Sequence, residues 1–506
     1  MTVLVLGDQL TRQVGPVADR DDAVLLIESR EFARKLPYHP HKLTLVFAAM
    51  RAFRDELREA GRTVHYHEVE TFREGFQAHF DANPADDLVI MDSPSRGATR
   101  RLNELIEGEG GTLSVVENEL FLCSRERFEQ WASERSRPYR HEDFYRMMRH
   151  ETDYLMDDGA PVGGEWNFDD RNREFPGRDH EPPTPPALEP TTQTQEVSDW
   201  VREEFAGGYD SPPYGGDWAD PEPFAWPVTR EQALSVLAAF VEHRLASFGP
   251  YQDAMLDGEW AMYHSLLAAP LNIGLLHPAE VVEAVIAGTR EDPAVPIESV
   301  EGFIRQVIGW REFMRGVYQT VPDLETANQL DATEELPDCY WTGETEMACL
   351  SDAIEGVRKR GYSHHIQRLM ILSNFGLLYG VEPAQLNRWF HAGYVDAYHW
   401  VTTPNVVEMG LFGSGVFATK PYAASANYIN RMSNYCADCP YDKDKTVGED
   451  ACPFNSLYWE FLDRNESTLR SNHRMGLVYS HLDNKDREGI RAQAERVRER
   501  MRDERL

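Results

Sequence analysis

Residues 300–318 read Val300-Glu-Gly-Phe-Ile-Arg-Gln-Val-Ile-Gly-Trp-Arg-Glu-Phe-Met-Arg-Gly-Val-Tyr318, and they predict a helix that continues to Thr320. Nearly every stretch after Pro227 also reads as helix. The other helices predicted there are Arg230–Ser247, Ala279–Ala287, Cys349–Arg360, His364–Tyr379, Pro383–Ala392 and Lys485–Arg505. We therefore expect a large all-α domain over residues 228–506.

The first 130 residues predict a different architecture, in which strands alternate with helices. Apolar runs occur at Val3–Gly7, Ala23–Glu28, Val64–His67, Leu88–Met91 and Leu113–Glu117, with amphipathic stretches such as Lys42–Ala60 and Ala98–Glu107 between them. Short strands separated by helices indicate a parallel, Rossmann-like α/β sheet. No GxGxxG motif follows the first strand. The turn Gly7-Asp8-Gln9-Leu10 stands instead at the strand end, where open α/β sheets bind ligands.

Residues 131–227 predict an irregular connector between the two domains. From about Gly159 onward this part is rich in proline, glycine and acidic residues, and it includes Pro182-Pro183, Pro212-Pro213 and Gly215-Gly216. Such clusters mark loops and linkers. One short helix is predicted near Val197–Phe205.

The 506-residue chain carries 85 acidic and 51 basic residues, a formal charge of −34. Lysine is scarce, and an acidic surface poor in lysine suits concentrated salt, so we interpret the charge as that of a halophile. An ordinary acidic enzyme is the alternative, because net charge reports on solubility and not on fold. The charge does not exclude DNA as a partner, since at about 1 M salt the Debye length is roughly 3 Å. We expect no membrane span and no signal peptide, and hence a cytoplasmic protein.

The cysteines suggest a metal site. Three of the six stand as Cys436-x2-Cys439-x12-Cys452, and a proline follows each of the last two. Disulfides are rare in the cytosol, so close cysteines favour a metal or a redox pair. The fourth thiolate would come from Cys349 or Cys339. Spacing alone leaves an iron–sulfur cluster, structural zinc and no metal open.

Several segments besides 300–318 carry a resemblance to a known family. They are Tyr251-Gln-Asp-Ala-Met255, His264-Ser-Leu-Leu-Ala-Ala-Pro-Leu-Asn-Ile-Gly274, Tyr362-Ser-His-His-Ile-Gln-Arg-Leu-Met370, Asp396-Ala-Tyr398 and Thr419-Lys-Pro-Tyr-Ala-Ala-Ser-Ala-Asn-Tyr-Ile-Asn-Arg-Met432. In this order the chain resembles the photolyase–cryptochrome superfamily, and within it the iron–sulfur bacterial cryptochromes and prokaryotic (6-4) photolyases. The resemblance runs from Gly7 to Asn455.

The resemblance implies two cofactors in the helical domain. One is FAD, in an apolar pocket with a few placed polar groups. Its expected neighbours are Tyr251, His264, Ser265, Arg311, Arg368, Asp396 and Asn405. Among them, Ser265 and nearby backbone N–H groups suit a pyrophosphate, and the two arginines can balance a reduced, anionic flavin. The other cofactor is a [4Fe–4S] cluster held by Cys349, Cys436, Cys439 and Cys452, which leaves Cys123 and Cys339 as structural thiols.

The pair His364-His365 is expected to serve repair of the (6-4) lesion, which needs a proton as the electron arrives. Adjacent residues on a helix point about 100° apart, so both cannot face the lesion equally. By position in the family pattern, we predict His365 as the proton donor and His364 as its partner.

Other roles follow from the same resemblance. Trp389 and Trp341 match aromatic residues that relay electrons to the flavin, but the family has tyrosine after the first of them and this chain has Phe390. Tyr422 and Tyr428 are predicted next to the lesion or the flavin. DNA, with the damaged bases flipped out, is expected to contact the basic run Arg358-Lys359-Arg360.

The α/β domain is expected to hold an antenna, 6,7-dimethyl-8-ribityllumazine, at the strand ends. Asp8, Gln9, Glu28 and Lys42 are the candidate contacts. Turn formation or surface exposure is the competing explanation for each of them.

The hypothesis is thus a monomeric, light-driven photolyase that repairs (6-4) photoproducts in UV-damaged DNA with reduced FAD. A cryptochrome-like blue-light receptor without repair activity and a cyclobutane-dimer photolyase are the alternatives.

Overall fold

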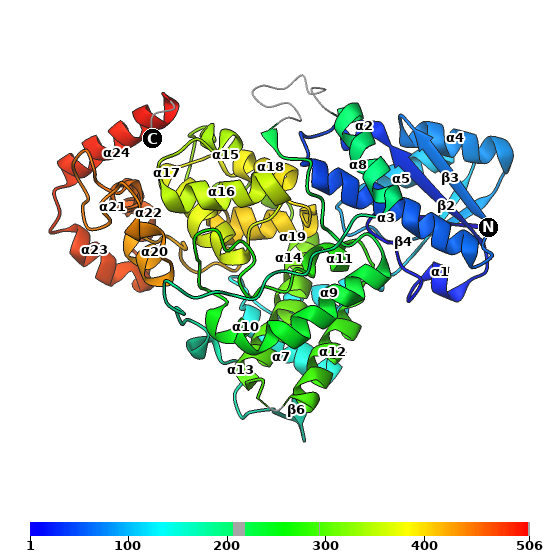
Figure 1. Cartoon of the computed structure of the whole chain (residues 1–506), viewed down its shortest axis with the longest axis horizontal. Coiled ribbons are helices and arrows are strands. Elements are labelled where there is room, and N and C mark those ends of the chain that lie inside the picture. Colours follow the sequence, from blue (N-terminus) through cyan, green and yellow to red (C-terminus); the bar gives the residue numbers. More distant parts are fainter. Residues whose placement is uncertain (206–217, 293, 504–506) are drawn as a thin grey trace.

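A computed structural model describes residues 1–205, 218–292 and 294–503. The predicted Pro212-Pro213 and Gly215-Gly216 lie outside these ranges. The two-part architecture is confirmed: a parallel α/β layer at the N-terminal end adjoins a large helical body (Figure 1). None of the helices in the described ranges has the length and hydrophobicity that a membrane span requires.

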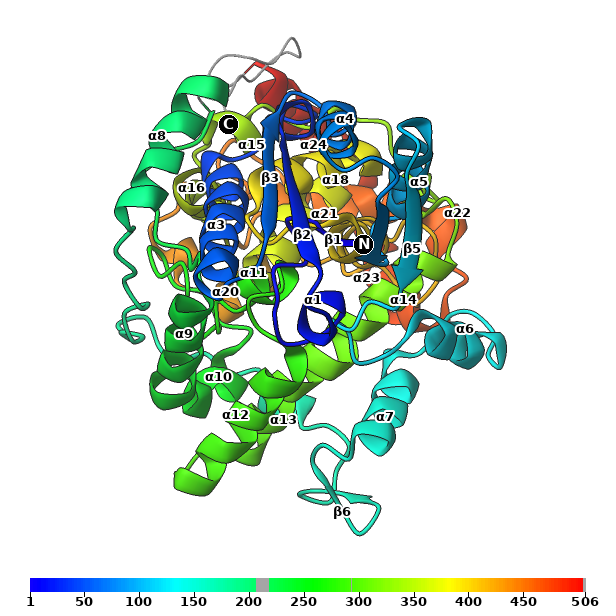
Figure 2. The ribbon, with the colours of Figure 1, turned by 90° about the vertical axis from the view of Figure 1, so that its right-hand side faces the viewer.

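The sheet has five parallel strands in the order β3-β2-β1-β4-β5. The strands are β1 Thr2–Val5, β2 Ala23–Ser29, β3 Val64–Val69, β4 Asp87–Met91 and β5 Thr112–Val116. Side chains alternate between the two faces, so Val3 and Val5 pack toward α3 (Pro40–Glu59), whereas Leu4 packs toward α4 (Phe72–Ala82) and α5 (Ala98–Gly108). Figure 2 shows these helices around the sheet.

The turn after β1 contacts the helical body directly. Strand order reverses between β1 and β4, which is where open α/β sheets bind ligands. Here the Leu10 N–H donates to the Ile273 carbonyl at 2.8 Å. Gly274 has φ of +87°, and a Cβ there would lie 3.0 Å from the Leu10 nitrogen. Glycine at this position therefore permits the close approach of the two domains.

The helical body follows the predicted pattern, with short additions. Its elements up to the middle of the domain are α9 Arg230–His243, α10 Leu245–Tyr251, α11 Ala268–Asn272, α12 Pro278–Glu291, α13 Ile297–Ile304, η3 Arg305–Arg311, α14 Glu312–Thr320, η4 Leu324–Thr326, α15 Cys339–Thr342 and α16 Ala348–Arg360. They continue with η5 Gln367–Ser373, α17 Asn374–Tyr379, α18 Pro383–Gly393, α19 His399–Thr403, η6 Pro404–Gly410, α20 Ala426–Met432, η7 Tyr435–Ala437, α21 Pro453–Arg464, α22 Glu466–Leu469, η8 His473–Met475, α23 Gly476–Leu482 and α24 Arg487–Arg502.

Three predicted helices are interrupted. The helix expected over His364–Tyr379 contains the π-helical segment η5. The helix expected over Arg230–Ser247 breaks at Arg244, whose backbone leaves helical geometry while its buried guanidinium donates to the carbonyls of His264 and Pro183 at 2.9 and 3.0 Å. The helix expected over 300–320 passes through a π-helical segment, η3, in its middle. At Arg244 and in η3, tertiary contacts override the local pattern.

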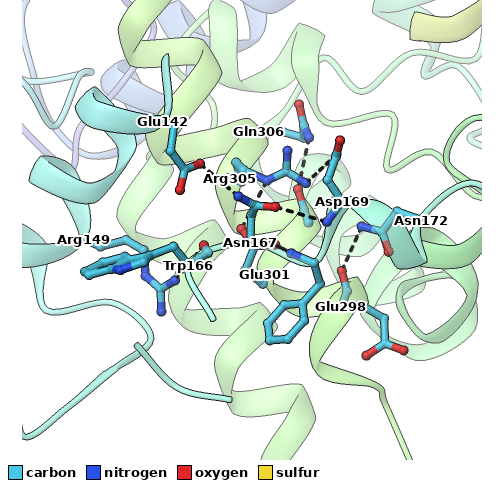
Figure 3. Close-up of polar contacts among 12 residues, drawn as sticks. Glu142, Arg149, Trp166, Asn167, Asp169, Asn172, Glu298, Glu301, Arg305 and Gln306 are labelled. Carbon is cyan, nitrogen blue, oxygen red and sulfur yellow. Dashed lines mark hydrogen bonds and ion pairs between the residues drawn. The ribbon is translucent and has the colours of Figure 1, made fainter. Parts of the chain in front are cut away.

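The segment 131–227, predicted as a connector with one short helix, contains more helix than that, and its first half is attached to the helical body. It contains α7 (His141–Thr152), η1 (Asp169–Arg171) and α8 (Thr192–Phe205). Figure 3 shows Asp169 and Glu301 both turned toward Arg305; the nitrogen–oxygen distances are 3.1 Å each. The backbone N–H of Phe168 donates to the other Glu301 oxygen at 3.2 Å. Because Glu301 is fully buried, these contacts fix the connector on η3.

Candidate functional site

Three π-helical segments lie at the centre of the helical body, and each carries a residue predicted to contact flavin. Arg311 ends η3, Arg368 is the second residue of η5, and Asn405 is the second residue of η6. Helix α14 continues η3 and packs against η6, which in turn packs against η5. Segments of π-helix occur preferentially at functional sites. The fold therefore assembles these three residues from distant parts of the chain.

Arg368 and Asp396 form a two-point ion pair. The guanidinium donates to the two carboxylate oxygens at 2.9 and 3.0 Å, and its Nε donates to the Ser363 carbonyl at 2.7 Å. It also lies over the Tyr394 ring, 4.2 Å from the centroid. The Asp396 side chain is 7% exposed, so the pair is held in a largely dry environment. The sequence predicted both residues but not their pairing.

Arg311 is paired as well, with the neighbouring Glu312 at 2.9 Å, and it lies over the Phe121 ring at 4.2 Å. Both predicted cations thus already face a carboxylate. Part of the positive charge predicted to balance an anionic flavin is therefore already neutralised by the protein. The Nε of Arg311 is nevertheless a buried donor with no partner among the described residues.

Other buried polar atoms without a partner lie on His264, a predicted flavin contact, and on His364, the predicted partner of the proton donor. They include the Nε2 of His264 and both ring nitrogens of His364, whose rings stack at 4.7 Å with 14° between planes. Burial lowers the pKa of His264 to about 3 and that of His364 well below its ordinary value, so both are neutral. Buried polar atoms are normally hydrogen-bonded, so these atoms fit a site completed by a polar cofactor.

His365 lies in a different environment from His364. Solvent reaches its side chain, while His364 is fully buried. Surrounding protein and then the charge of Arg368 lower the pKa of His365 to about 4. Of the two histidines, His365 is therefore the one that a substrate can reach, whereas His364 packs on His264.

The remaining flavin candidates use their polar atoms locally. Ser265 accepts from the Leu267 N–H at 3.4 Å just before α11, and Asn405 donates to the Val401 carbonyl at 2.8 Å. Tyr251 packs on Tyr263, with 5.6 Å between ring centroids. Backbone N–H groups at the start of α11 remain compatible with a pyrophosphate.

The candidate antenna contacts fall into two groups. Gln9 donates to the Met91 carbonyl at 2.9 Å, and buried Glu28 accepts two hydrogen bonds from Arg51 at 2.9 and 2.8 Å. Asp8 and Lys42 instead face Tyr398 of the helical body. Burial raises the pKa of Asp8 to about 6. Gln9 and Glu28 thus already have protein partners.

Lys42 links the two domains. Its Nζ donates to the carbonyls of His391 and Ala397 at 2.8 and 2.7 Å. Burial lowers its pKa to about 7, although Asp396 opposes the shift. The unfolded chain therefore binds more protons than the folded chain above pH 7, and the free energy of unfolding should rise from about pH 7 to about pH 10.

We expect Lys42→Met to remove this contribution to the rise. Denaturant unfolding at about pH 7 and about pH 9.5 measures it, because the parent should gain more stability over this window than the variant. Lys35→Met, at an exposed lysine just before α3, is the matched control and should behave as the parent. Equal gains in stability for the parent and Lys42→Met would contradict the conclusion that burial lowers the pKa of Lys42.

The four predicted cluster ligands surround one small cavity. Cys349, Cys436, Cys439 and Cys452 line it together with Tyr435, whereas Cys339 does not. No three His, Cys, Asp or Glu side chains in the described ranges converge closely enough to hold one metal ion. Burial, and then the neighbouring thiols, raise the pKa of Cys349 well above its usual range.

Cys349→Ser should therefore lose iron and acid-labile sulfide from the purified protein, whereas Cys339→Ser should keep about four of each per chain. Cys339 is the matched control, because it is also buried and lies outside the cavity. Zinc in the parent, or loss of iron from both variants alike, would contradict the ligand assignment.

Of the tryptophans predicted for electron relay, Trp389 lies in an aromatic cluster next to Arg368, and Trp341 packs on a different tryptophan. Trp389 is buried, donates to the Tyr340 carbonyl at 3.0 Å and packs on the Tyr340 ring at 5.0 Å. Its ring is also 5.9 Å from Tyr394, which lies beneath Arg368. Trp341 follows Tyr340 and packs on Trp218 at 5.0 Å. Phe390 stacks on Tyr394 at 5.0 Å.

Sequence reasoning missed Tyr394 and His141. Tyr394 lies between Trp389 and Arg368 and bonds to the Ser363 hydroxyl at 2.7 Å. The His141 ring stacks on Trp310 at 3.7 Å with 3° between planes. Tyr394 stands two residues before Asp396, and this proximity was the only signal in the sequence. Nothing in the sequence indicated His141.

The predicted DNA contacts lie in two places. Tyr422 is 41% exposed, and Tyr428 is half-buried on α20. Arg358 donates from Nε to the Trp218 carbonyl at 3.0 Å, and Lys359 pairs with Glu355 on its own helix. Arg358 and Lys359 thus contact the connector and α16, and no contact joins them to the tyrosines.

Comparisons with known proteins agree on one family. Residues 3–212 match the model of the deoxyribodipyrimidine photo-lyase-related proteins. A (6-4) photolyase from Agrobacterium fabrum is 40% identical over 489 residues, which cover 94% of each chain. A bacterial class III photolyase from Agrobacterium tumefaciens has a similar fold, with a TM-score of 0.58 and 20% identity over 83% of this chain and 81% of that one. A Synechocystis cryptochrome gives a TM-score of 0.57 at 14% identity over 85% and 86%.

Proposed function

Because the chain belongs to the photolyase–cryptochrome superfamily, in the branch of the prokaryotic (6-4) photolyases, we propose that it repairs UV-damaged DNA in the light, with the (6-4) photoproduct as its substrate. The observation that carries this proposal is the 40% identity to a (6-4) photolyase over 94% of both chains. The solvent-accessible His365 beside the Arg368–Asp396 pair supports it.

The cofactor and the residues around its proposed site have separate roles in such a reaction. Bound FAD, when reduced and excited, would supply the electron. The orphaned nitrogens of His264, His364 and Arg311 would hydrogen-bond the cofactor, and the Arg368–Asp396 pair would hold one wall of its site. His365 would hold a proton and give it to the lesion. The proton must come from the imidazolium, so anionic neighbours have to raise its pKa from about 4.

We also propose the remaining cofactors and partners. The four cysteines around one cavity support a [4Fe–4S] cluster. A ribityllumazine antenna would bind at the strand ends, where Asp8 has no side-chain ion pair among the described residues. DNA binding, a monomeric state, a cytoplasmic location and a halophilic habitat remain predictions.

Illumination of the purified, reduced protein with DNA that carries either lesion tests the function. We expect repair of the (6-4) photoproduct. Repair of neither lesion would favour a cryptochrome-like receptor, and repair of cyclobutane dimers alone would contradict the substrate.

A further inference from the structure

Two arginines beside Tyr422 and Tyr428 differ from most arginines of this acidic chain. Arg431 on α20 and Arg474 in η8 are both exposed, and neither forms an ion pair with any residue in the described part of the chain. Arg431 lies over the Tyr428 ring, 5.4 Å from the centroid. Arg474 donates to the Thr419 hydroxyl at 2.6 Å, three residues before Tyr422. In a chain with net charge −34, such exposed cations are available to an anion.

Contacts between two segments place Arg474 beside Tyr422. Asn472 donates to the Thr419 carbonyl at 2.7 Å, so the η8 turn is attached to the segment that presents Tyr422. Burial raises the pKa of Tyr422, and Arg474 opposes this shift, which places the guanidinium close to the ring. The surface made by Arg431, Arg474, Tyr422 and Tyr428 is called the tyrosine rim below.

The connector supplies a third cation to the tyrosine rim. Arg173 acts electrostatically on both Tyr422 and Tyr428. It pairs with Asp169, whose second oxygen binds the buried Arg305 at 3.1 Å, and Figure 3 shows Asp169 turned toward Arg305. The attachment of the connector to η3 therefore determines where Arg173 lies. Because Asp169 already pairs with Arg173, Arg431 and Arg474 are better able than Arg173 to bind an anion.

On the basis of the proposed function, we propose that Arg431 and Arg474 bind backbone phosphates of the damaged strand on either side of the extruded bases, and that Tyr422 and Tyr428 stack on the nucleotides between them. A guanidinium binds phosphate at two points, and aromatic rings next to cations are the usual combination for unpaired nucleic acid. The predicted contacts Arg358 and Lys359 are less suited to this role. Arg358 already donates to the Trp218 carbonyl, and Lys359 already pairs with Glu355.

The test measures the affinity of the flavin-loaded protein for (6-4)-damaged DNA in the dark, over a range of salt concentrations. The double variant Arg431→Ala/Arg474→Ala should bind damaged and undamaged DNA more weakly. The slope of log affinity against log salt should become shallower by about 1.4 to 1.8, the value for two lost phosphate contacts. Arg290→Ala on α12 removes another exposed arginine, which forms no ion pair with the side chains that the structure describes, and should leave the slope unchanged.

A conservative double variant distinguishes loss of charge from misfolding. Arg431→Lys/Arg474→Lys keeps both charges and should retain most of the slope, with the flavin content and thermal midpoint of the parent. An unchanged slope in the alanine variant, or an equal loss in Arg290→Ala, would overturn the proposal. The dark measurement does not depend on repair, so a parent that binds through this surface but repairs neither lesion would contradict only the proposed function.

Discussion

Replacement of His365 by alanine is expected to lower (6-4) repair by at least about 100-fold while FAD stays bound, because a positioned general acid contributes about 10²- to 10⁴-fold. His365 is the accessible histidine of the pair, and no hydrogen bond in the described structure uses its ring. Its loss removes the proton donor without breaking a hydrogen bond among the described residues. Repair per absorbed photon, with flavin absorbance as the check on cofactor content, measures the effect.

The pH profile separates proton donation from a structural role. The imidazolium is the donor, so repair by the parent should slow as the pH rises through the pKa of His365 in the loaded protein. Negative charge on DNA and cofactor should raise that pKa above the value of about 4 in the free protein. The residual repair of His365→Ala should lack this dependence. Undiminished repair by the variant would remove the assigned role.

His364→Ala is the companion variant, and we expect a different result. His364 is fully buried on His264, so its loss leaves a cavity next to the proposed flavin site. The variant should be less stable and should bind flavin more weakly than the parent. Proton transfer in the flavin-loaded fraction should be retained. Equal pH profiles for His364→Ala and the parent, at full flavin occupancy, would support this division of roles.

Arg368→Leu is the second change with a large expected effect. It leaves the Asp396 carboxylate, 7% exposed, without its cation. Breaking a buried pair on one side typically costs about 3–5 kcal/mol of unfolding free energy. Flavin should also be lost, since the pair forms a wall of its proposed site. Denaturant unfolding and the flavin-to-protein absorbance ratio measure both effects.

The double variant Arg368→Met/Asp396→Leu is the control for this prediction. Replacement of both members by apolar residues removes the unpaired charge and should recover most of the stability, but not flavin binding. Arg470→Ala breaks an exposed pair with Asp483 and should change stability little. Full flavin content in the double variant would contradict a role for the pair in the cofactor site.

The sequence was informative where the signal is local. Hydrophobic periodicity reports which face of each strand or helix is buried, and this sufficed for the strands and for helices such as α16 and α18. It did not indicate the break at Arg244 or the π segment inside 300–320. Both depend on contacts with residues far away in the chain, and local periodicity contains no information on those contacts.

The prediction of the site had the same limits. Motif resemblance named Arg368, Asp396 and His264 from the stretches in which they stand. It did not reveal that Arg368 pairs with Asp396, 28 residues away, or that His264 stacks on His364, 100 residues away. The basic run 358–360 is conspicuous in the sequence, but in the structure Arg358 contacts the connector.

The segment 300–318, with the motifs that follow it, therefore determined by itself the helical domain, the family and the types of residue at its centre. Only the tertiary structure decided which charges are already paired, which histidine solvent can reach and which arginines are left for a phosphate. The reason is physical: the helical period is a property of a few consecutive residues, whereas burial and pairing depend on which distant segments pack together.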